Sequence, residues 1–249
     1  MASISTDELD LKLLDNFNGL VVKKDLTHKL KDGVNVPTFV LEYLLANYCS
    51  TTDQEKLDKG MENVKEILKK HYVEPDQAGQ VQSTMKANSR HKIIDRISVR
   101  LDPSQDKYWA RLFNSNIKNA NIPEHFVEEH DKLLSGGIWA IIDMEYDPEI
   151  KHGSTHYPFL VDNIQPIQLS SFSDDKIEAV IDQFSKEEWA NLLLRSLGLE
   201  PTANDMTKRV KYLLLSRLIP LVESNFNMIE LGPRGTGKSF IFRNISPYA

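Results

Sequence analysis

A glycine-rich segment near the end of the sequence constrains the fold more than any other feature. It reads Gly-Pro-Arg-Gly-Thr-Gly-Lys-Ser over residues 232–239, which fits the spacing G-x-x-x-x-G-K-[ST] at every position. In proteins that use this spacing, the loop follows a β-strand and opens a helix. The strand expected over 226–231 and the helix-capable stretch 240–243 provide such flanks. We therefore expect the strand–loop–helix unit of a phosphate-binding loop.

Each residue type in this segment has its own chemical task. Glycines let successive backbone N–H groups turn inward around phosphate oxygens, and the start of a helix adds its dipole. The Lys238 ammonium is expected to reach the β- and γ-phosphates, and the Ser239 hydroxyl is the expected Mg²⁺ ligand. The predicted cofactors are ATP and Mg²⁺. The predicted nucleotide contacts are Gly232, Gly235, Thr236, Gly237, Lys238 and Ser239.

The expected ATPase core is short, since ten residues follow Ser239. A parallel nucleotide-binding sheet buries its strands on both faces and therefore needs further strands beside 226–231. A later acidic residue usually completes the Mg²⁺ site. We expect residues 226–249 to form a truncated ATPase core, with weak or absent nucleotide binding and no assignable catalytic residue in this chain alone. The full-length protein is expected to be an ATPase.

Composition restricts the environment of the chain. Its 249 residues are 41% hydrophobic and carry a formal net charge of −6, and they contain no apolar run long enough to cross a bilayer. The acidic N-terminus lacks the pattern of a signal peptide. The single cysteine, Cys49, cannot form an internal disulfide and suits a reducing compartment. We expect a cytoplasmic protein with no membrane partner.

Helical patterns dominate the first 80 residues, which we expect to form a helical subdomain. The stretches 37–48 and 52–71 place apolar residues three or four apart, as in amphipathic helices. Residues 73–89 contain Pro75, Gly79 and several small polar residues. That composition predicts a linker or mobile loop.

Strand patterns follow over 81–172. Residues 91–102 alternate apolar and polar side chains, 108–113 predict a second strand, and 114–121 a short third. A helix is expected over 123–134, ended by Gly136 and Gly137, and strands over 138–146 and 157–169. Three strands, a helix and two strands is the order of a five-stranded oligonucleotide-binding (OB) barrel. The fold class that we predict is α+β, with an OB-like barrel over 81–172.

A helical connector is expected over 173–225, between the barrel and the ATPase core. Helices are predicted over 174–184, 185–197 and 204–219. Ser185 and Glu188 have the spacing of a capping box at the start of the second helix. Basic residues of the third helix, Arg217 among them, are expected to be solvated or to lie between subunits.

Basic residues concentrate in the predicted barrel. From 85 to 118 there are eight basic and three acidic residues, a local charge of +5 in an acidic chain. Alternation places Arg96 and Arg100 on the solvent side, where they could follow a phosphate backbone, while Ile97, Val99 and Leu101 fill the interior. The predicted DNA contacts are Lys86, Arg90, Lys92, Arg96, Arg100 and Arg111.

Two points stay open in this prediction. Arg111 shares a face with Trp109 and Phe113, and that face is either buried or an aromatic platform for nucleic acid. The competing interpretation of the whole set is an ordinary charged surface.

The segment 230–239, leading into Asn-Ile-Ser-Pro-Tyr at 244–248, resembles the BrxL family, the Lon-related AAA+ proteins of BREX phage-restriction systems. The run 192–201 and the helical N-terminal part support this resemblance. It implies an N-terminal DNA-binding region, an AAA+ ATPase and a Lon-protease-like domain, assembled as rings around DNA. The implied partners are double-stranded DNA, further copies of the chain and other BREX proteins.

The function expected from this resemblance is the DNA-binding and ring-assembly region of a phage-defence ATPase. The alternative is the substrate-recognition region of an ATP-dependent Lon-like protease, in which case the basic strands are an ordinary surface.

Overall fold

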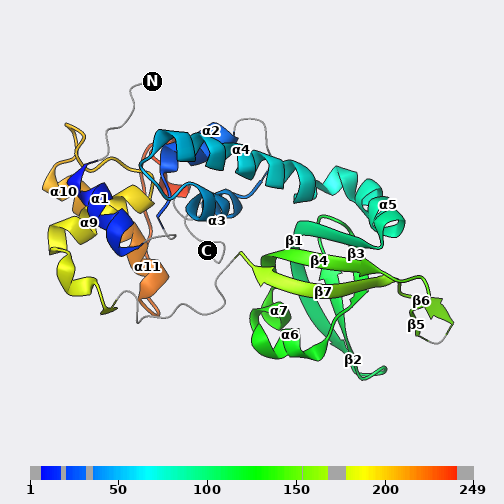
Figure 1. The fold of residues 1–249 in the computed structure, drawn as a ribbon. Helices are drawn as coiled ribbons and strands as arrows, with labels where there is room; N and C mark the ends of the chain where they lie inside the picture. Colours follow the sequence, from blue (N-terminus) through cyan, green and yellow to red (C-terminus); the bar gives the residue numbers. More distant parts are fainter. Residues whose placement is uncertain (1–6, 18–20, 32–35, 153, 168–177, 240–249) are drawn as a thin grey trace. The chain divides into compact units, whose positions relative to one another are not determined.

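The computed structural model describes residues 7–17, 21–31, 36–152, 154–167 and 178–239. The fold is α+β, with a five-stranded sheet and helices (Figure 1). The chain divides into two compact units. One comprises residues 59–172, and the other combines 1–58 with 173–249. Each unit is described by itself.

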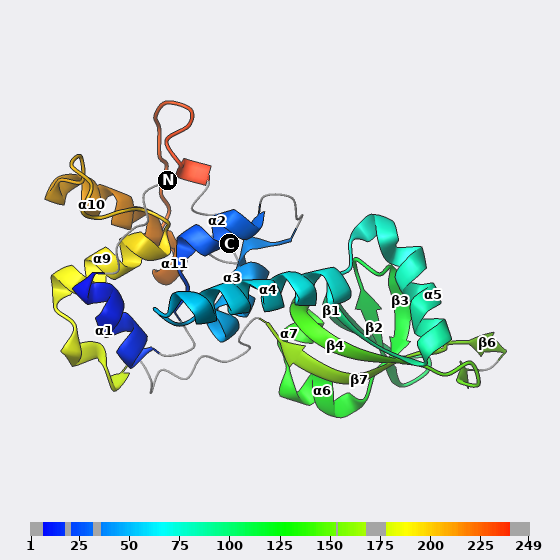
Figure 2. The same cartoon turned by 45° about the horizontal axis from the view of Figure 1, so that its top comes forward.

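The sheet belongs to the unit 59–172 and closes on itself. Its strands are β1 (Arg90–Asp102), β2 (Lys107–Leu112), β3 (Ile117–Asn121), β4 (Ile138–Tyr146) and β7 (Phe159–Pro166). They follow one another around a closed barrel in the order β1-β2-β3-β7-β4, and β1 also pairs with β4 (Figure 2). Every pair is antiparallel except β3 with β7. The predicted succession of strands is confirmed.

Strand β1 shows why the sequence folds into a barrel wall. Ile97 and Val99 are buried in the barrel core, and Arg96 and Arg100 are exposed. The prediction for Leu101 was wrong, because its side chain is 47% exposed. Leu101 pairs with Tyr108, one residue beyond the last pair that joins β2 to β3. No third strand continues the wall there among the described residues.

The segment between β3 and β4 forms two short helices, α6 (Glu124–Glu129) and α7 (Lys132–Ser135), where one helix was predicted. The backbone of His130 departs from helical geometry at the end of α6. Gly136 ends α7, and Gly137 has a positive φ of 81°. The predicted stop at these two glycines is confirmed.

The predicted linker over 73–89 is wrong. Residues Pro75–Gln77 form a 3₁₀ turn (η1), and Ala78–Asn88 form the helix α5. Met85 of α5 is 1% exposed and belongs to the barrel core, with Val81 packed beside it. Packing against the barrel stabilises a helix whose sequence shows little apolar periodicity. A small hairpin, β5 (Lys151–His152) with β6 (Thr155–His156), was also not predicted and projects from the barrel in Figure 2.

The first 72 residues contain the helices α1 (Glu8–Asn16), α2 (Lys24–Lys31), α3 (Thr38–Tyr48) and α4 (Gln54–His71). The predictions for α3 and α4 are confirmed to within two residues. Cys49 follows α3 and is 2% exposed, and burial raises the pKa of its thiol. After α4, the Tyr72 ring stacks on Trp139 of β4 at 6.3 Å between centroids.

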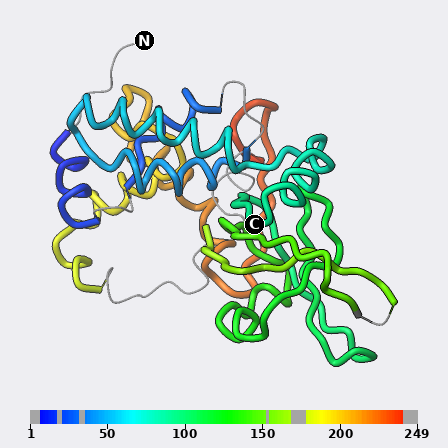
Figure 3. The backbone as a smooth tube through the Cα atoms, turned by 45° about the vertical axis from the view of Figure 1, so that its right-hand side comes forward, coloured from blue at the N-terminus to red at the C-terminus, as the bar shows by residue number. Residues whose placement is uncertain are grey.

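The helical connector differs from its prediction in length. Its described elements are η2 (Ile181–Gln183), α9 (Lys186–Ser196), α10 (Lys208–Leu215), η3 (Ser216–Leu218) and α11 (Ile219–Val222), which Figure 3 traces as yellow to orange tube. The Ser185–Glu188 capping box is present. Residues 174–177 of the predicted helix 174–184 lie outside the described residues, and its described end contains the 3₁₀ turn η2. The predicted helix 204–219 begins at Lys208, because the Thr207 side chain caps it there.

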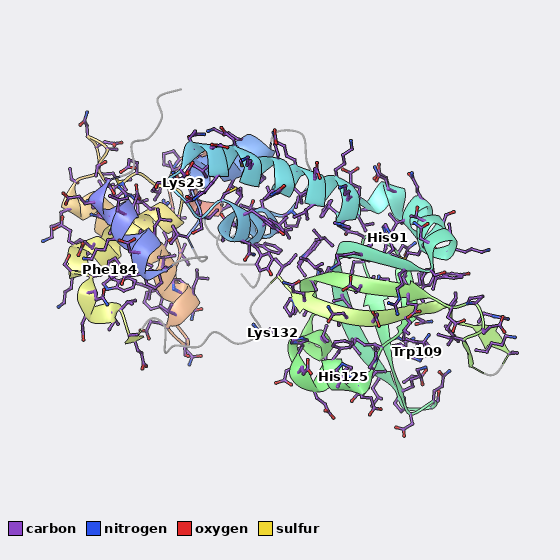
Figure 4. All side chains as sticks on the ribbon, viewed as in Figure 1. Lys23, His91, Trp109, His125, Lys132 and Phe184 are labelled. Carbon is purple, nitrogen blue, oxygen red and sulfur yellow. The ribbon has the colours of Figure 1, made fainter. Side chains whose placement is uncertain are left out.

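Contacts across the unit that combines 1–58 with 173–249 tie α1 to α9. Arg195 donates hydrogen bonds to Asp7 and Asp10, and Lys12 pairs with Glu188 at 2.8 Å. The rings of Phe17, Phe184 and Trp189 pack beside these ion pairs, with Phe184 labelled in Figure 4. The N-terminal helix is therefore held by residues that lie 176 to 188 positions later in the sequence.

Candidate phosphate-binding loop and nucleic-acid interface

Two glycines of the loop 232–239 adopt left-handed backbone angles. Gly235 and Gly237 have φ angles of 82° and 75°, which residues with a side chain rarely adopt. Lys238 and Ser239 are helical, so the loop leads into a helix start as predicted. The glycines therefore give this segment its curvature.

The Lys238 ammonium lies within the loop. It donates to the carbonyl oxygen of Gly232 at 3.2 Å, to that of Pro233, and to Thr236 Oγ1 at 2.8 Å. The loop thus places the only lysine of residues 232–239 where a bound anion would meet it. These residues fit a nucleotide phosphate, and the exposed Ser239 hydroxyl fits one position of a Mg²⁺ coordination sphere. A bound nucleotide with Mg²⁺ would supply the phosphoryl group for transfer.

The strand expected before the loop is absent. Residues 226–233 have no strand assignment, and Ile229 and Leu231 are 88% and 90% exposed. A parallel strand needs neighbours for its backbone hydrogen bonds and its two apolar faces. The described residues provide none there, which explains the difference from the prediction.

Arg217 was predicted to be solvated or intersubunit, and this was wrong. It is 8% exposed and forms a bidentate pair with Glu230, at 2.9 Å from Nε and 2.6 Å from Nη2. Nη2 also lies 3.4 Å from the carbonyl oxygen of Thr236. No spacing rule links positions 217 and 230, so the sequence carried no signal for this pair.

The barrel brings two of the predicted DNA contacts together. Arg96 of β1 and Arg111 of β2 place their guanidinium carbons 4.8 Å and 4.7 Å from the centre of the Phe113 ring. Both arginines are exposed, so two cations contact the Phe113 ring on the outer wall. Of the three residues that share this side of β2, Arg111 is exposed and Trp109 is buried.

Arg100 continues this face along β1. Its Nη2 donates to the side-chain oxygen of Asn119 on β3 at 3.0 Å, and the Arg100 side chain is exposed. Among the ion pairs of the described residues, none joins Arg96, Arg100 or Arg111 to a carboxylate. We call these three residues with Phe113 the basic barrel face. It combines positive charge with an aromatic ring, both of which suit nucleic acid.

Trp109 lies next to this face but is buried. The Trp109 side chain is labelled in Figure 4. Its ring centre is 4.5 Å from that of Tyr157, and the Lys107 ammonium lies over the ring at 4.6 Å from its centre. Lys107 also donates to Asn121 at 2.6 Å, and burial lowers the pKa of its ammonium. Lys107 extends the positive surface and was not among the predicted contacts, although the local charge count included it.

The remaining predicted contacts lie elsewhere. Arg90 and Lys92, at the start of β1, face Glu145 at 3.7 Å and Asp143 at 3.3 Å on β4. Lys86 is exposed on α5. Pairing with carboxylates reduces the attraction of Arg90 and Lys92 for a phosphate backbone. The structure does not gather them with Arg96 and Arg111.

Asp95 supports the basic barrel face from inside. Its carboxylate is fully buried and accepts from the backbone N–H groups of Asn114 and Ser115, each at 2.8 Å, and from the Ser115 hydroxyl. Burial raises the pKa of Asp95, although these hydrogen bonds oppose the shift. The hydrogen bonds fix the turn that follows Phe113.

Comparison with known proteins now decides the family. Residues 15–146 match the family described as BREX system Lon protease-like protein BrxL N-terminal. Residues 159–249 match Lon-like protease BrxL-like, ATPase domain. The chain belongs to the BrxL family. The resemblance expected from the phosphate-binding loop is thereby confirmed.

Two BrxL relatives are similar along almost the whole chain. The Lon-like protease BrxL of Bacillus cereus (strain H3081.97) is 46% identical over 243 residues, which are 97% of this chain and 35% of the relative. That of Escherichia coli O9:H4 (strain HS) is 43% identical over 240 residues, or 96% of this chain and 34% of the relative. The chain spans about a third of the length of these BrxL relatives. No helix in the described part of the chain is long and apolar enough to cross a membrane.

Proposed function

We propose that this chain is the DNA-binding and ring-assembly region of a BREX-type phage-defence AAA+ ATPase. The observation that carries the proposal is the basic barrel face, where two guanidinium groups flank Phe113 without a carboxylate partner among the described ion pairs. Membership of the BrxL family and the strand order of the barrel support it, because OB-like barrels commonly bind nucleic acid on their outer face. Duplex DNA is the proposed ligand.

The phosphate-binding loop gives the second part of the proposal. ATP with Mg²⁺ is the proposed cofactor of the full-length protein, held by the loop glycines, Lys238 and Ser239. Further copies of the chain and other BREX proteins are the proposed partners, in the cytoplasm. Exposed apolar side chains on α10 and α11 support assembly, with Leu213 60% and Val222 77% exposed.

Salt-dependent DNA binding tests the main proposal. Each arginine that contacts a phosphate of a duplex contributes about one unit to the slope of log affinity against log salt. Replacing Arg96, Arg100 and Arg111 together with Gln is expected to lower that slope by about three units and to weaken binding on all sequences alike. The melting temperature should change little, because exposed charges contribute little to stability.

A matched variant controls for the loss of charge itself. Lys65, Lys69 and Lys70 are exposed on α4, and replacing them with Gln removes the same total charge. This control should keep most of the affinity and the salt slope. Equal losses in the two triple variants would show that only net charge matters, and an unchanged arginine variant would contradict the proposed face.

The alternative function, recognition of protein substrates for a Lon-like protease, has one structural feature in its favour. A hollow of about 380 Å³ on the barrel is lined by Leu101, Asp106, Tyr108, Glu124, Val127, Glu128 and Leu134. Apolar and acidic side chains together suit a basic, partly apolar peptide. If the chain binds such a peptide and no DNA even at low salt, the protease interpretation is favoured.

A further inference from the structure

Arg217 connects the turn η3 to the segment before the phosphate-binding loop and to the loop itself. It lies in the 3₁₀ turn η3, its carboxylate partner Glu230 stands two residues before Gly232, and its third contact is the carbonyl oxygen of Thr236 within the loop. With 8% of its surface exposed, it is the only arginine or lysine that the described residues bury to this degree. Burying a guanidinium is costly unless its donors are used.

The contact with Thr236 determines which way one peptide unit of the loop faces. The chain has no cis peptide bond among the described residues, and in a trans peptide the C=O and the following N–H point in opposite directions. Arg217 attracts the Thr236 carbonyl oxygen to one side of the loop. The N–H of Gly237 therefore faces the other side.

The Gly237 backbone has the freedom that this orientation requires, since its φ is 75°. In phosphate-binding loops, N–H groups that face inward hold the phosphate oxygens. The contact therefore aligns one donor before any anion arrives. Such pre-alignment raises affinity because the bound state then costs less conformational entropy.

The bidentate pair with Glu230 fixes the guanidinium plane. Nε and Nη2 each donate to a different carboxylate oxygen, at 2.9 Å and 2.6 Å. Two parallel hydrogen bonds restrict rotation of the guanidinium more than one would. Glu230 thus orients Arg217, and Arg217 orients the Thr236–Gly237 peptide.

We propose that Arg217 is a positioning residue of the nucleotide site, which holds the Thr236–Gly237 peptide with its N–H directed toward the phosphates. This inference rests on the proposed binding of ATP phosphates by the loop. It places the role of Arg217 in phosphate affinity and in the link between η3 and the loop, with no contact to the nucleotide.

A pair of variants separates positioning from stability. Glu230→Gln keeps Arg217, and its amide oxygen replaces one of the two carboxylate acceptors of the guanidinium beside Thr236. The double variant Arg217→Met, Glu230→Gln lacks the contact with Thr236, and it leaves no unpaired carboxylate behind. Binding of ATP and of tripolyphosphate is measured with Mg²⁺ by titration calorimetry on the full-length protein carrying each variant, and the melting temperature of each variant is recorded.

The double variant is expected to bind both anions about tenfold more weakly than Glu230→Gln, because it loses one aligned phosphate donor. The factor should be the same for ATP and tripolyphosphate, since the adenosine plays no part. If Arg217 only stabilised the fold, the double variant would lose affinity only where its melting temperature also falls. Equal affinities in the two variants would overturn the inference while the loop assignment stands.

Lys238→Ala tests the assignment on which the inference depends. Wild type should bind tripolyphosphate more tightly than Lys238→Ala, because the variant lacks the ammonium within the loop. If wild type and Lys238→Ala bind neither anion, the loop assignment itself fails, and the role of Arg217 falls with it. The two failures are therefore distinguished before the Arg217 variants are compared.

Discussion

Gly137 lies directly against the backbone of Ile97, so close that a Cβ atom on Gly137 would come within 2.4 Å of the Ile97 carbonyl oxygen. This contact joins the end of α7 to the middle of β1, where the barrel wall is buried. Gly137 also has a φ of 81°. Both the available space and the backbone geometry therefore require glycine.

Gly137→Ala is expected to destabilise the barrel by about 2 kcal/mol or more, from backbone strain and from the clash with a carbonyl that cannot move freely. Gly136→Ala is the matched control, because a Cβ there meets nothing within 4 Å. Urea unfolding of both variants measures the difference. Equal stabilities would show that β1 yields to the new methyl group.

Asp95→Ala should also destabilise the barrel. The variant leaves the N–H groups of Asn114 and Ser115 without their acceptor, at a cost of about 1–3 kcal/mol for each buried group. Asp102→Ala is the control, since Asp102, the last residue of β1, accepts from Ser104 in an exposed turn. A similar loss of stability in both variants would mean that burial of Asp95 adds nothing.

The pair of Asp7 with Arg195 predicts a pH dependence. The guanidinium of Arg195 lowers the pKa of Asp7 from 3.8 to about 2 in the folded chain. A lowered carboxyl pKa contributes stability that is present above the unfolded pKa and is lost as pH falls through the folded pKa. The contribution of Asp7 should therefore disappear between about pH 4 and pH 2.

Asp7→Asn should lower the melting temperature at neutral pH, and the difference from wild type should shrink across that window. Glu8→Gln is the control, because Glu8 lies in the same helical turn but is exposed. It should have a smaller effect. A difference between Asp7→Asn and wild type that stays constant from neutral pH to pH 2 would contradict the assigned cause.

The barrel strands were predictable because alternation records which side of each strand is buried. Ile97 and Val99 point inward and Arg96 and Arg100 outward, and the sequence shows that period of two directly. The Ser185 cap was predictable for a similar reason, since both partners lie within four residues. Patterns among neighbouring residues therefore predict the secondary structure of the segment in which they occur.

The features that the sequence did not predict depend on contacts between residues far apart in the chain. Helix α5 is held by Met85 in the barrel core, and its polar residues resemble a loop. Arg217 meets Glu230 and Thr236 only because the chain after η3 returns to it. Among the predicted DNA contacts, Arg96 and Arg111 meet around Phe113, whereas Arg90 and Lys92 face carboxylates of β4 that strand patterns could not identify as neighbours.

The ring of Phe113 provides the last prediction, which rests on the proposed DNA contact. The ring restricts the side chains of Arg96 and Arg111, whose guanidinium carbons lie within 5 Å of its centre. Phe113→Leu removes the cation–π contacts but keeps both charges. Duplex affinity should fall by about threefold, since ordering the freed Arg111 side chain on binding costs free energy, whereas Arg96 still donates to the Gly136 carbonyl oxygen at 2.7 Å. The salt slope should stay at the wild-type value, because no phosphate contact is lost. A slope reduced as in the triple arginine variant would mean that the ring itself positions the backbone contacts, and unchanged affinity would show that the arginines bind without its help.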